Sequence, residues 1–241
     1  MRILVTNDDG MHASQLPNLV RWCKTLGDVT VIVPKVEQSG KSHGIQLREA
    51  FEIKEDVIDG DIPILSVDST PADCVRYAVL GLKQKFDLVV SGVNRGMNLG
   101  KDIMYSGTVG AVSEAVALGI PAVAFSIDPS NYDSACDHLS EAWDFIQKHN
   151  LYALNPAYNV NFPPMEPKGI RVTRQGGPYY SDDFELVGEN LYHPRGKMIW
   201  NDSGDLTLDT DCVMHGYISV MPLSATRADM GVYEKIKNLA E

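Results

Sequence analysis

The sequence lacks three features that would have indicated other classes of protein: clustered cysteines, a long apolar run and an early apolar leader. Its cysteines are widely separated, which excludes the paired spacing of zinc and redox motifs; they are Cys23, Cys74, Cys136 and Cys212. The longest charge-free apolar run, Ala115–Ile127, contains a proline and is too short to span a bilayer. Acidic residues interrupt the first ten residues, unlike a signal peptide. We therefore expect a cytoplasmic protein with free thiols and no membrane partner.

Positive charge is also scarce. The 241 residues carry 21 Lys and Arg against 32 Asp and Glu, giving a net charge of −11. Such a chain is repelled by a nucleic-acid backbone, so we expect no nucleic-acid polymer as partner. A small phosphorylated ligand in a local site remains compatible with this charge.

Apolar strand-like runs alternate with helical patterns through residues 1–150. The expected strands are Ile3–Thr6, Val29–Val33, Phe51–Val57, Ile62–Val67, Phe86–Ser91 and Ile120–Ile127. The expected helices are Leu16–Leu26, one beginning at Thr70-Pro71, Thr108–Leu118 and Ser134–His149. This alternation predicts an α/β fold: a Rossmann-like, mostly parallel sheet with helices on both faces, forming a core over 1–150 that would hold any catalytic site at the carboxyl ends of its strands.

The pattern changes beyond Leu151. Short strand-like pieces follow at Tyr158–Phe162, Ile170–Thr173 and Tyr217–Met221. Residues 151–241 are expected to complete the core and to add an extended β-hairpin at about 181–211 and a terminal helix for oligomerisation. The eight acids of 181–211 are expected on a solvated surface, and the apolar residues among them favour self-association.

Two adjacent carboxylates, Asp8 and Asp9, close the first expected strand before Gly10. Ligands of open α/β sheets collect at the carboxyl ends of strands. Adjacent carboxylates repel each other there, so a cation is expected to compensate them. The alternative is a plain turn with an Asx cap to the next helix.

Loops after two other expected strands offer neutral oxygen ligands. Gly40-Lys41-Ser42 resembles the end of a P-loop, but Lys35 stands where that motif needs glycine. Ser39 instead offers a hydroxyl to the same centre as the two aspartates, with a plain polar loop as the alternative. Asn94 lies in a glycine-rich loop that does not fit the dinucleotide fingerprint, and its side chain serves either a cation or a local turn. An all-oxygen set suits Mg²⁺ or Mn²⁺.

Ser106-Gly107-Thr108 leads into the expected helix 108–118 and offers free backbone N–H groups and two hydroxyls to an anion. The alternative is a simple helix cap. His12 and His43 lie in loops near this centre and are candidates for acid–base chemistry. Neither the HExxH motif nor the G-x-S-x-G motif occurs.

Taken together, these loops resemble the SurE (survival protein E) family of metal-dependent 5′/3′-nucleotidases. The matching segments are NDDG at 7–10, QSG at 38–40, GVNRGMNLG at 92–100, YSGTVGA at 105–111, AYNVNFPP at 157–164, DTD at 209–211 and GYISVMPL at 216–223. The resemblance covers nearly the whole chain. Gln15, Lys41 and Gly44 depart from the family pattern, in the surroundings of the expected ligands.

The resemblance implies roles for particular residues. One divalent cation, Mg²⁺ or Mn²⁺, would be bound by Asp8, Asp9, Ser39 and Asn94. The substrate phosphate would lie at Ser106, Gly107 and Thr108, with Asn7 and Asn98 nearby, and the catalytic residues would be Asp8, Asp9, Asn94 and Ser106. It also implies a homodimer or tetramer built from C-terminal elements.

The expected reaction is hydrolysis of nucleoside 5′- and 3′-monophosphates by water that the cation activates, with short polyphosphate as a side substrate. The main competing hypothesis is a nonenzymatic nucleotide- or metal-binding module on the same fold. The other is a metal-dependent glycosyltransferase, which requires a nucleotide-sugar donor and an acceptor.

Overall fold

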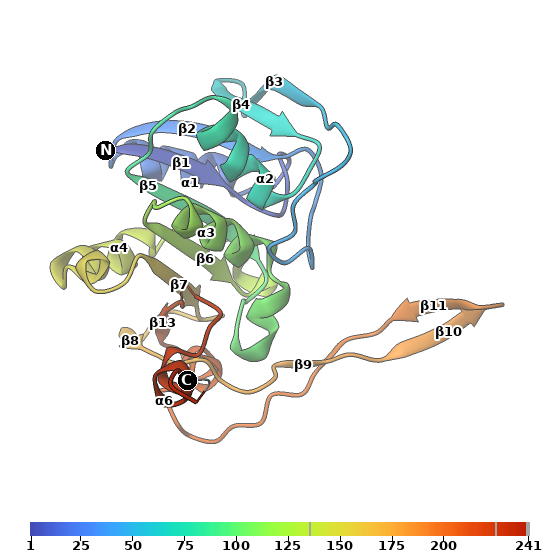
Figure 1. The fold of residues 1–241 in the computed structure, drawn as a ribbon, viewed down its shortest axis with the longest axis vertical. Coiled ribbons are helices and arrows are strands. Elements are labelled where there is room, and N and C mark those ends of the chain that lie inside the picture. The colour runs from blue at the N-terminus through green and yellow to red at the C-terminus, as the bar shows by residue number, and fades with distance from the viewer. Residues whose placement is uncertain (135, 225, 240–241) are drawn as a thin grey trace.

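A single nine-stranded sheet forms the centre of the molecule. The computed structural model describes residues 1–134, 136–224 and 226–239 (Figure 1). The strands of this sheet are β1 (Arg2–Thr6), β2 (Asp28–Pro34), β3 (Ile53–Ile58), β4 (Ile62–Val67), β5 (Leu88–Arg95), β6 (Ala122–Ile127), β7 (Ala157–Phe162), β8 (Ile170–Val172) and β13 (Ile218–Pro222). Their order across the sheet is β3-β4-β2-β1-β5-β6-β7-β13-β8. Only the β3–β4 and β7–β13 pairs of this sheet are antiparallel, which confirms the mostly parallel α/β fold.

Helices cover both faces of the sheet, as the sequence predicts. They are α1 (Leu16–Lys24), α2 (Pro71–Arg76), α3 (Gly107–Ala117), α4 (Leu139–Lys148), α5 (Asp209–Met214) and α6 (Met230–Ile236). Shorter 3₁₀ or π turns occur at Tyr77–Gly81, Gly100–Tyr105, Pro129–Ser134 and Leu151–Ala153. No helix within the described residues is long and apolar enough to cross a membrane.

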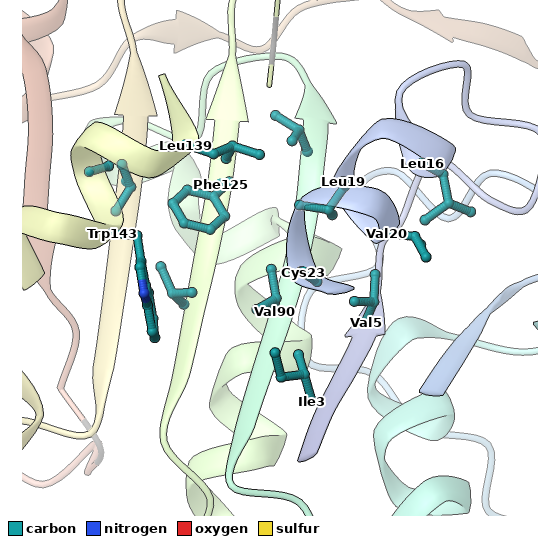
Figure 2. Close-up of a cluster of buried hydrophobic side chains, with 14 of the residues drawn as sticks. Ile3, Val5, Leu16, Leu19, Val20, Cys23, Val90, Phe125, Leu139 and Trp143 are labelled. Atoms are coloured by element: carbon teal, nitrogen blue, oxygen red, sulfur yellow. The ribbon is translucent and has the colours of Figure 1, made fainter. Parts of the chain in front are cut away.

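The alternation of side chains along the strands produces two cores. Ile3 and Val5 point to the face covered by α1 and α4, whereas Leu4 points to the face covered by α2 and α3. Helix α1 buries the stripe predicted from its spacing, and Figure 2 shows Leu19 and Cys23 lying over β1 and β5. These packed layers hold the carboxyl ends of the strands in fixed positions.

Several element ends differ from the predictions. Strand β5 continues to Arg95 rather than ending at Ser91, with an irregularity in its pairing to β6 between Ser91 and Asn94. Asn94 therefore belongs to the strand end and not to a free loop. Helix α4 begins at Leu139 and not at Ser134, because Pro129–Ser134 forms a separate 3₁₀ segment.

The C-terminal part joins the same sheet and then leaves it. Strand β7 pairs in parallel with β6, so the sheet continues across residue 150. Four short strands form an arm that extends away from the sheet (Figure 1); they are β9 (Tyr180–Ser181), β10 (Phe184–Gly188), β11 (Leu191–Pro194) and β12 (Lys197–Met198). The prediction of a hairpin with solvated acids out to residue 211 was wrong at its end. Asp209 and Asp211 are buried at the start of α5.

Candidate active site

The candidate site lies where the strand order reverses. The chain passes from β1 to β2 on one side, whereas β5 and β6 extend the sheet on the other side of β1. The carboxyl ends of β1 and β5 therefore flank a crevice of the kind in which α/β sheets bind ligands. Asp8 and Asp9 follow β1, and the backbone N–H of Arg95 in β5 donates to Asp9 Oδ2 at 3.0 Å.

The turn after β1 is built from its own side chains. Asn7 Nδ2 donates to the Gly10 carbonyl at 3.0 Å, and the Gly10 N–H donates to Asn7 Oδ1 at 3.2 Å. Gly10 has φ of +85°, and a Cβ there would lie 2.9 Å from the carbonyl carbon of Val36, so the turn requires glycine. Asn7 is buried and shapes the turn that presents the carboxylates, while its expected place near the phosphate stays a prediction.

Asp8 lies against the beginning of α3. Thr108 Oγ1 donates a short hydrogen bond to Asp8 Oδ1. A Cβ on Gly107 would lie 2.9 Å from Asp8 Cβ and 3.0 Å from its Oδ2, so only glycine allows this approach. Burial raises the pKa of Asp8, although the Thr108 hydroxyl and the backbone N–H groups of Gly107 and Thr108 favour its charged form.

Asp9 supplies the second carboxyl group, which is only partly buried. Burial, together with the neighbouring carboxylates of Asp8 and Glu37, raises the pKa of Asp9 to about 6, although the Arg95 N–H and charge oppose this shift. The charges of Asp8 and Glu37 thus act on Asp9 against the opposing charge of Arg95. Negative charge that is incompletely balanced in this way favours binding of a divalent cation.

Ser39 and Asn94 lie beside these carboxylates, but both have local partners. The Gln38 N–H donates to the Asp8 carbonyl at 2.7 Å, which holds the 38–40 loop against the β1 turn. Ser39 Oγ donates to Glu37 Oε1 at 2.7 Å, and Asn94 Nδ2 donates to the Gly96 carbonyl at 2.7 Å. The side-chain carbonyl oxygen of Asn94, Oδ1, remains available for a cation. Within the described ranges no cluster of three or more His, Cys, Asp or Glu side chains forms a metal site, so neutral oxygens would have to complete the set.

The sequence left open whether Ser106-Gly107-Thr108 forms a simple helix cap or an anion site, and the start of α3 has features of both. Ser106 is the N-cap, and its Oγ accepts from the Val109 N–H at 3.1 Å. Thr108 does not cap the helix but holds Asp8. A helix N-terminus favours anions through its free N–H groups and its dipole. The expected cation ligands and a helix end that suits an anion therefore lie side by side.

The two histidines have different surroundings. The Nε2 of His43 lies 2.6 Å from Glu114 Oε2, and Arg76 Nη1 donates to the other carboxylate oxygen at 3.0 Å. Glu114 is buried in α3, so this triad ties the loop that contains Ser39 to the helix that binds Asp8. His12 is exposed and lines a cavity beside Asp9.

Asn98 is fixed by polar side chains of the central strands, which the sequence analysis missed. Its N–H donates to Asn161 Oδ1 at 2.8 Å, and its carbonyl accepts from the amides of Asn159 and Asn161. Asn98 Nδ2 donates to Ser126 Oγ at 2.7 Å. The sequence did contain a signal for this cluster, because Asn159 and Asn161 stand at alternate positions of the apolar strand β7 and therefore share one face.

Asp209 fixes the end of the same glycine-rich loop. It accepts hydrogen bonds from the N–H groups of Gly100 at 2.9 Å and Gly176 at 2.7 Å. Asp211 accepts from Trp200 Nε1 and from Ser203, which anchors the chain returning from the arm. The acids of the DTD segment thus connect the C-terminal part to the candidate site.

Comparison with known proteins agrees with this arrangement. Residues 3–182 match the family model described as Survival protein SurE. A curated relative named 5′-nucleotidase SurE, from Thermosipho melanesiensis, is 38% identical over 93% of this chain and 91% of its own length. The 5′-nucleotidase SurE 1 of Thermus thermophilus is 39% identical over 100% of this chain and 98% of its own. The crystal structure of the SurE protein from Aquifex aeolicus covers both chains completely, with a TM-score of 0.75 and 34% identity. The chain belongs to the SurE family.

Proposed function

We propose that this protein is a divalent-metal-dependent phosphomonoesterase that hydrolyses nucleoside 5′-monophosphates, with 3′-monophosphates as further substrates. The observation that carries the proposal is the contact between Asp8 and the start of α3, which lies at the point where the strand order reverses. It sets a cation-binding pair of carboxylates beside an anion-binding helix end. The names of the curated relatives support the same reaction class.

The proposed cation is Mg²⁺ or Mn²⁺, and the donor set fits it. Asp8 and Asp9 supply charge, and their raised pKa values reflect carboxylates crowded and buried without sufficient positive charge. Ser39 and Asn94 would add a hydroxyl and an amide oxygen, and the Ser39 hydroxyl, which donates its proton to Glu37, keeps its lone pairs for the cation. When bound, such an ion neutralises phosphoryl oxygens and lowers the pKa of water.

The protein's own groups orient the substrate. The Ser106 hydroxyl proton would donate to the phosphate at the helix start, since Ser106 Oγ only accepts within the helix cap. The N–H groups of Gly107 and Thr108 face Asp8, so this end of the helix would act on the phosphate through its dipole. The hydrogen bond from Thr108 fixes the orientation of Asp8. The asparagine cluster around Asn98 fixes the glycine-rich loop that follows β5.

Water is the proposed nucleophile, with no phosphorylated enzyme on the path. Asp8 is a poor nucleophile because it is buried and accepts a hydrogen bond from Thr108. Ser106 would need a base, but within the described residues its Oγ hydrogen-bonds only to the Val109 N–H, and His43, which lines the same cavity, contacts Glu114 instead. Asp9 is assigned to the cation, which leaves direct attack by water as the proposed path.

Phosphate release from nucleoside 5′- and 3′-monophosphates, measured with the purified protein and Mn²⁺, tests the proposal. Asp9→Asn should abolish release, while Asp144→Asn, on the exposed face of α4, should behave as wild type. Nucleotide binding without release would favour the nonenzymatic module. Transfer of sugar from a nucleotide-sugar would favour the glycosyltransferase.

The proposal extends to assembly, side activity and location. The arm exposes Phe184, Leu186 and Leu191, and α6 exposes Met230 and Tyr233, which supports a homodimer or tetramer formed through these elements. Short polyphosphate is a proposed side substrate. A cytoplasmic location is supported by four free cysteines, three of them buried.

A further inference from the structure

A cavity opens directly beside Asp9, at the point where the strand order reverses. Its volume is about 690 Å³, within the range of small-molecule sites. It is lined by Asp9 and the residues just after it, by Glu37, by Arg95, and by the 129–133 segment. None of the sequence motifs accounts for its far wall, which comes from the 3₁₀ segment Pro129–Ser134 after β6.

Arg95 and Tyr132 give this cavity a flat cationic and aromatic side. The Arg95 guanidinium carbon lies 6.0 Å from the centre of the Tyr132 ring. Tyr132 is buried, and its hydroxyl donates to the Val93 carbonyl at 3.3 Å, so the ring is fixed to β5. The Arg95 side chain is exposed, which leaves its planar group free to stack on an aromatic ligand.

The other charged groups of the cavity are mainly acceptors of hydrogen bonds. Glu37 and Asp133 line it together with Asp9. Carboxylates bind ligands that donate hydrogen bonds, such as ribose hydroxyls and the N–H groups of a base, and they repel a second phosphate. The cavity therefore suits the uncharged part of a nucleotide.

A different cavity, of about 900 Å³, lies on the Ser106 side of the site, and the described residues that line it include no carboxylate. Its basic residues are His43, Arg174 and Arg227, of which His43 contacts Glu114 and Arg174 pairs with Asp205. The side next to the phosphate-binding helix therefore has no lining carboxylate, whereas the side next to Asp9 is acidic. The first side suits the phosphate of a nucleoside monophosphate, and the second suits its uncharged nucleoside.

We propose that the cavity beside Asp9 is the nucleoside subsite, in which the base stacks on the Arg95 guanidinium and the nucleoside donors meet Glu37 and Asp133. This inference rests on the proposed nucleotidase function and names the part of the substrate that the family motifs leave unassigned. Arg95 is then a specificity-determining residue, which distinguishes nucleotides from simple phosphate esters.

The test compares two substrates in the same variant. The ratio of kcat/KM for guanosine 5′-monophosphate to that for glycerol 2-phosphate cancels any general loss of catalysis. Arg95→Met keeps the aliphatic stem but removes the planar cation, and we expect it to lower this ratio about tenfold, in line with the loss of one stacked base. Asp133→Asn, at the far wall, should lower the ratio as well. A ratio that Arg95→Met leaves unchanged, whether or not the activity itself falls, would overturn the proposed subsite.

Arg95→Lys serves as the matched control, because it keeps the charge near Asp9 but not the plane. A lowered ratio in this variant is expected, and a wild-type ratio would refute stacking. Calorimetric titration with guanosine measures the same site without turnover, and Arg95→Met should weaken this binding by a similar factor. If the wild type hydrolyses no phosphate ester, the proposed function fails, while guanosine binding that depends on Arg95 would still support the cavity as a nucleoside site.

Discussion

Replacing Gly107 by alanine tests whether Asp8 must lie against the start of α3. The added Cβ would stand 2.9 Å from Asp8 Cβ, 3.0 Å from its Oδ2 and 3.3 Å from the Gln38 carbonyl. Ordinary contact begins near 3.4 Å, so Asp8 must move by about half an ångström. Because the Gln38 N–H is bonded to the Asp8 carbonyl, the neighbouring loop cannot simply withdraw.

The expected effect falls mainly on catalysis. A displacement of about 1 Å at a reacting group costs about 100-fold in rate, so a shift half as large should lower kcat/KM about tenfold. Overpacking costs about 1–3 kcal/mol, whereas alanine is a better helix former than glycine by about 0.5–1 kcal/mol. The net loss of up to about 2.5 kcal/mol should lower Tm by no more than about 10 °C.

Phosphate release from a nucleoside monophosphate and thermal unfolding, measured on the same preparation, separate these effects. Gly177→Ala is the matched control, because a Cβ at Gly177 meets nothing within 4 Å and the residue has no positive φ. It should change neither rate nor Tm appreciably. Wild-type kcat/KM in Gly107→Ala, with normal Mn²⁺ affinity, would refute the argument that this close contact positions Asp8.

Four further outcomes are expected. Mn²⁺ at 100 times its Kd should stabilise the wild type by about 2.7 kcal/mol in thermal unfolding and Asp9→Asn hardly at all; an equal shift in both would remove Asp9 from the ligands. Rapid acid quench with phosphate-labelled nucleotide should show no protein-bound label at any early time, and label that forms and decays at the turnover rate would contradict direct attack by water. Hydrogen bonds and charge from His43 and Arg76 hold the pKa of Glu114 below its ordinary value, so its stabilising effect is full above about pH 4.5 and is lost as the pH falls through the lowered pKa. Glu114→Gln should accordingly lower stability at pH 7 by about 1.5–3 kcal/mol, the range for a hydrogen bond to a charged group, and progressively less in acid, as followed by urea unfolding. Light scattering should give at least a dimer mass, and introducing charge by Leu186→Asp on the arm should reduce it, whereas a wild-type monomer at micromolar concentration would contradict assembly.

The fold and the identity of the site loops could be predicted from local features of the sequence. The burial stripe of α1 and the continuous apolar strands reflect which side chains must leave water, and this pattern repeats with the period of each element. The start of α2 at Thr70-Pro71 was predictable for the same reason, since the Thr70 hydroxyl caps the helix by accepting from the Asp73 N–H, only three residues away, at 3.2 Å. The position of Asp8 and Asp9 at a strand end also followed from the order of elements.

Only the tertiary structure decided which distant groups meet. Thr108 bonds to Asp8 across 100 residues, and His43 meets Glu114 across 71. No local periodicity encodes these pairs, because they depend on how the strands are ordered in the sheet and on how closely α3 approaches β1. Asp209 shows the same limit: its sequence surroundings are polar and predict a solvated surface, yet the fold buries it, where the N–H groups of Gly100 and Gly176 replace water. A buried carboxylate is stable only where such donors converge, and their convergence is a property of the packed chain.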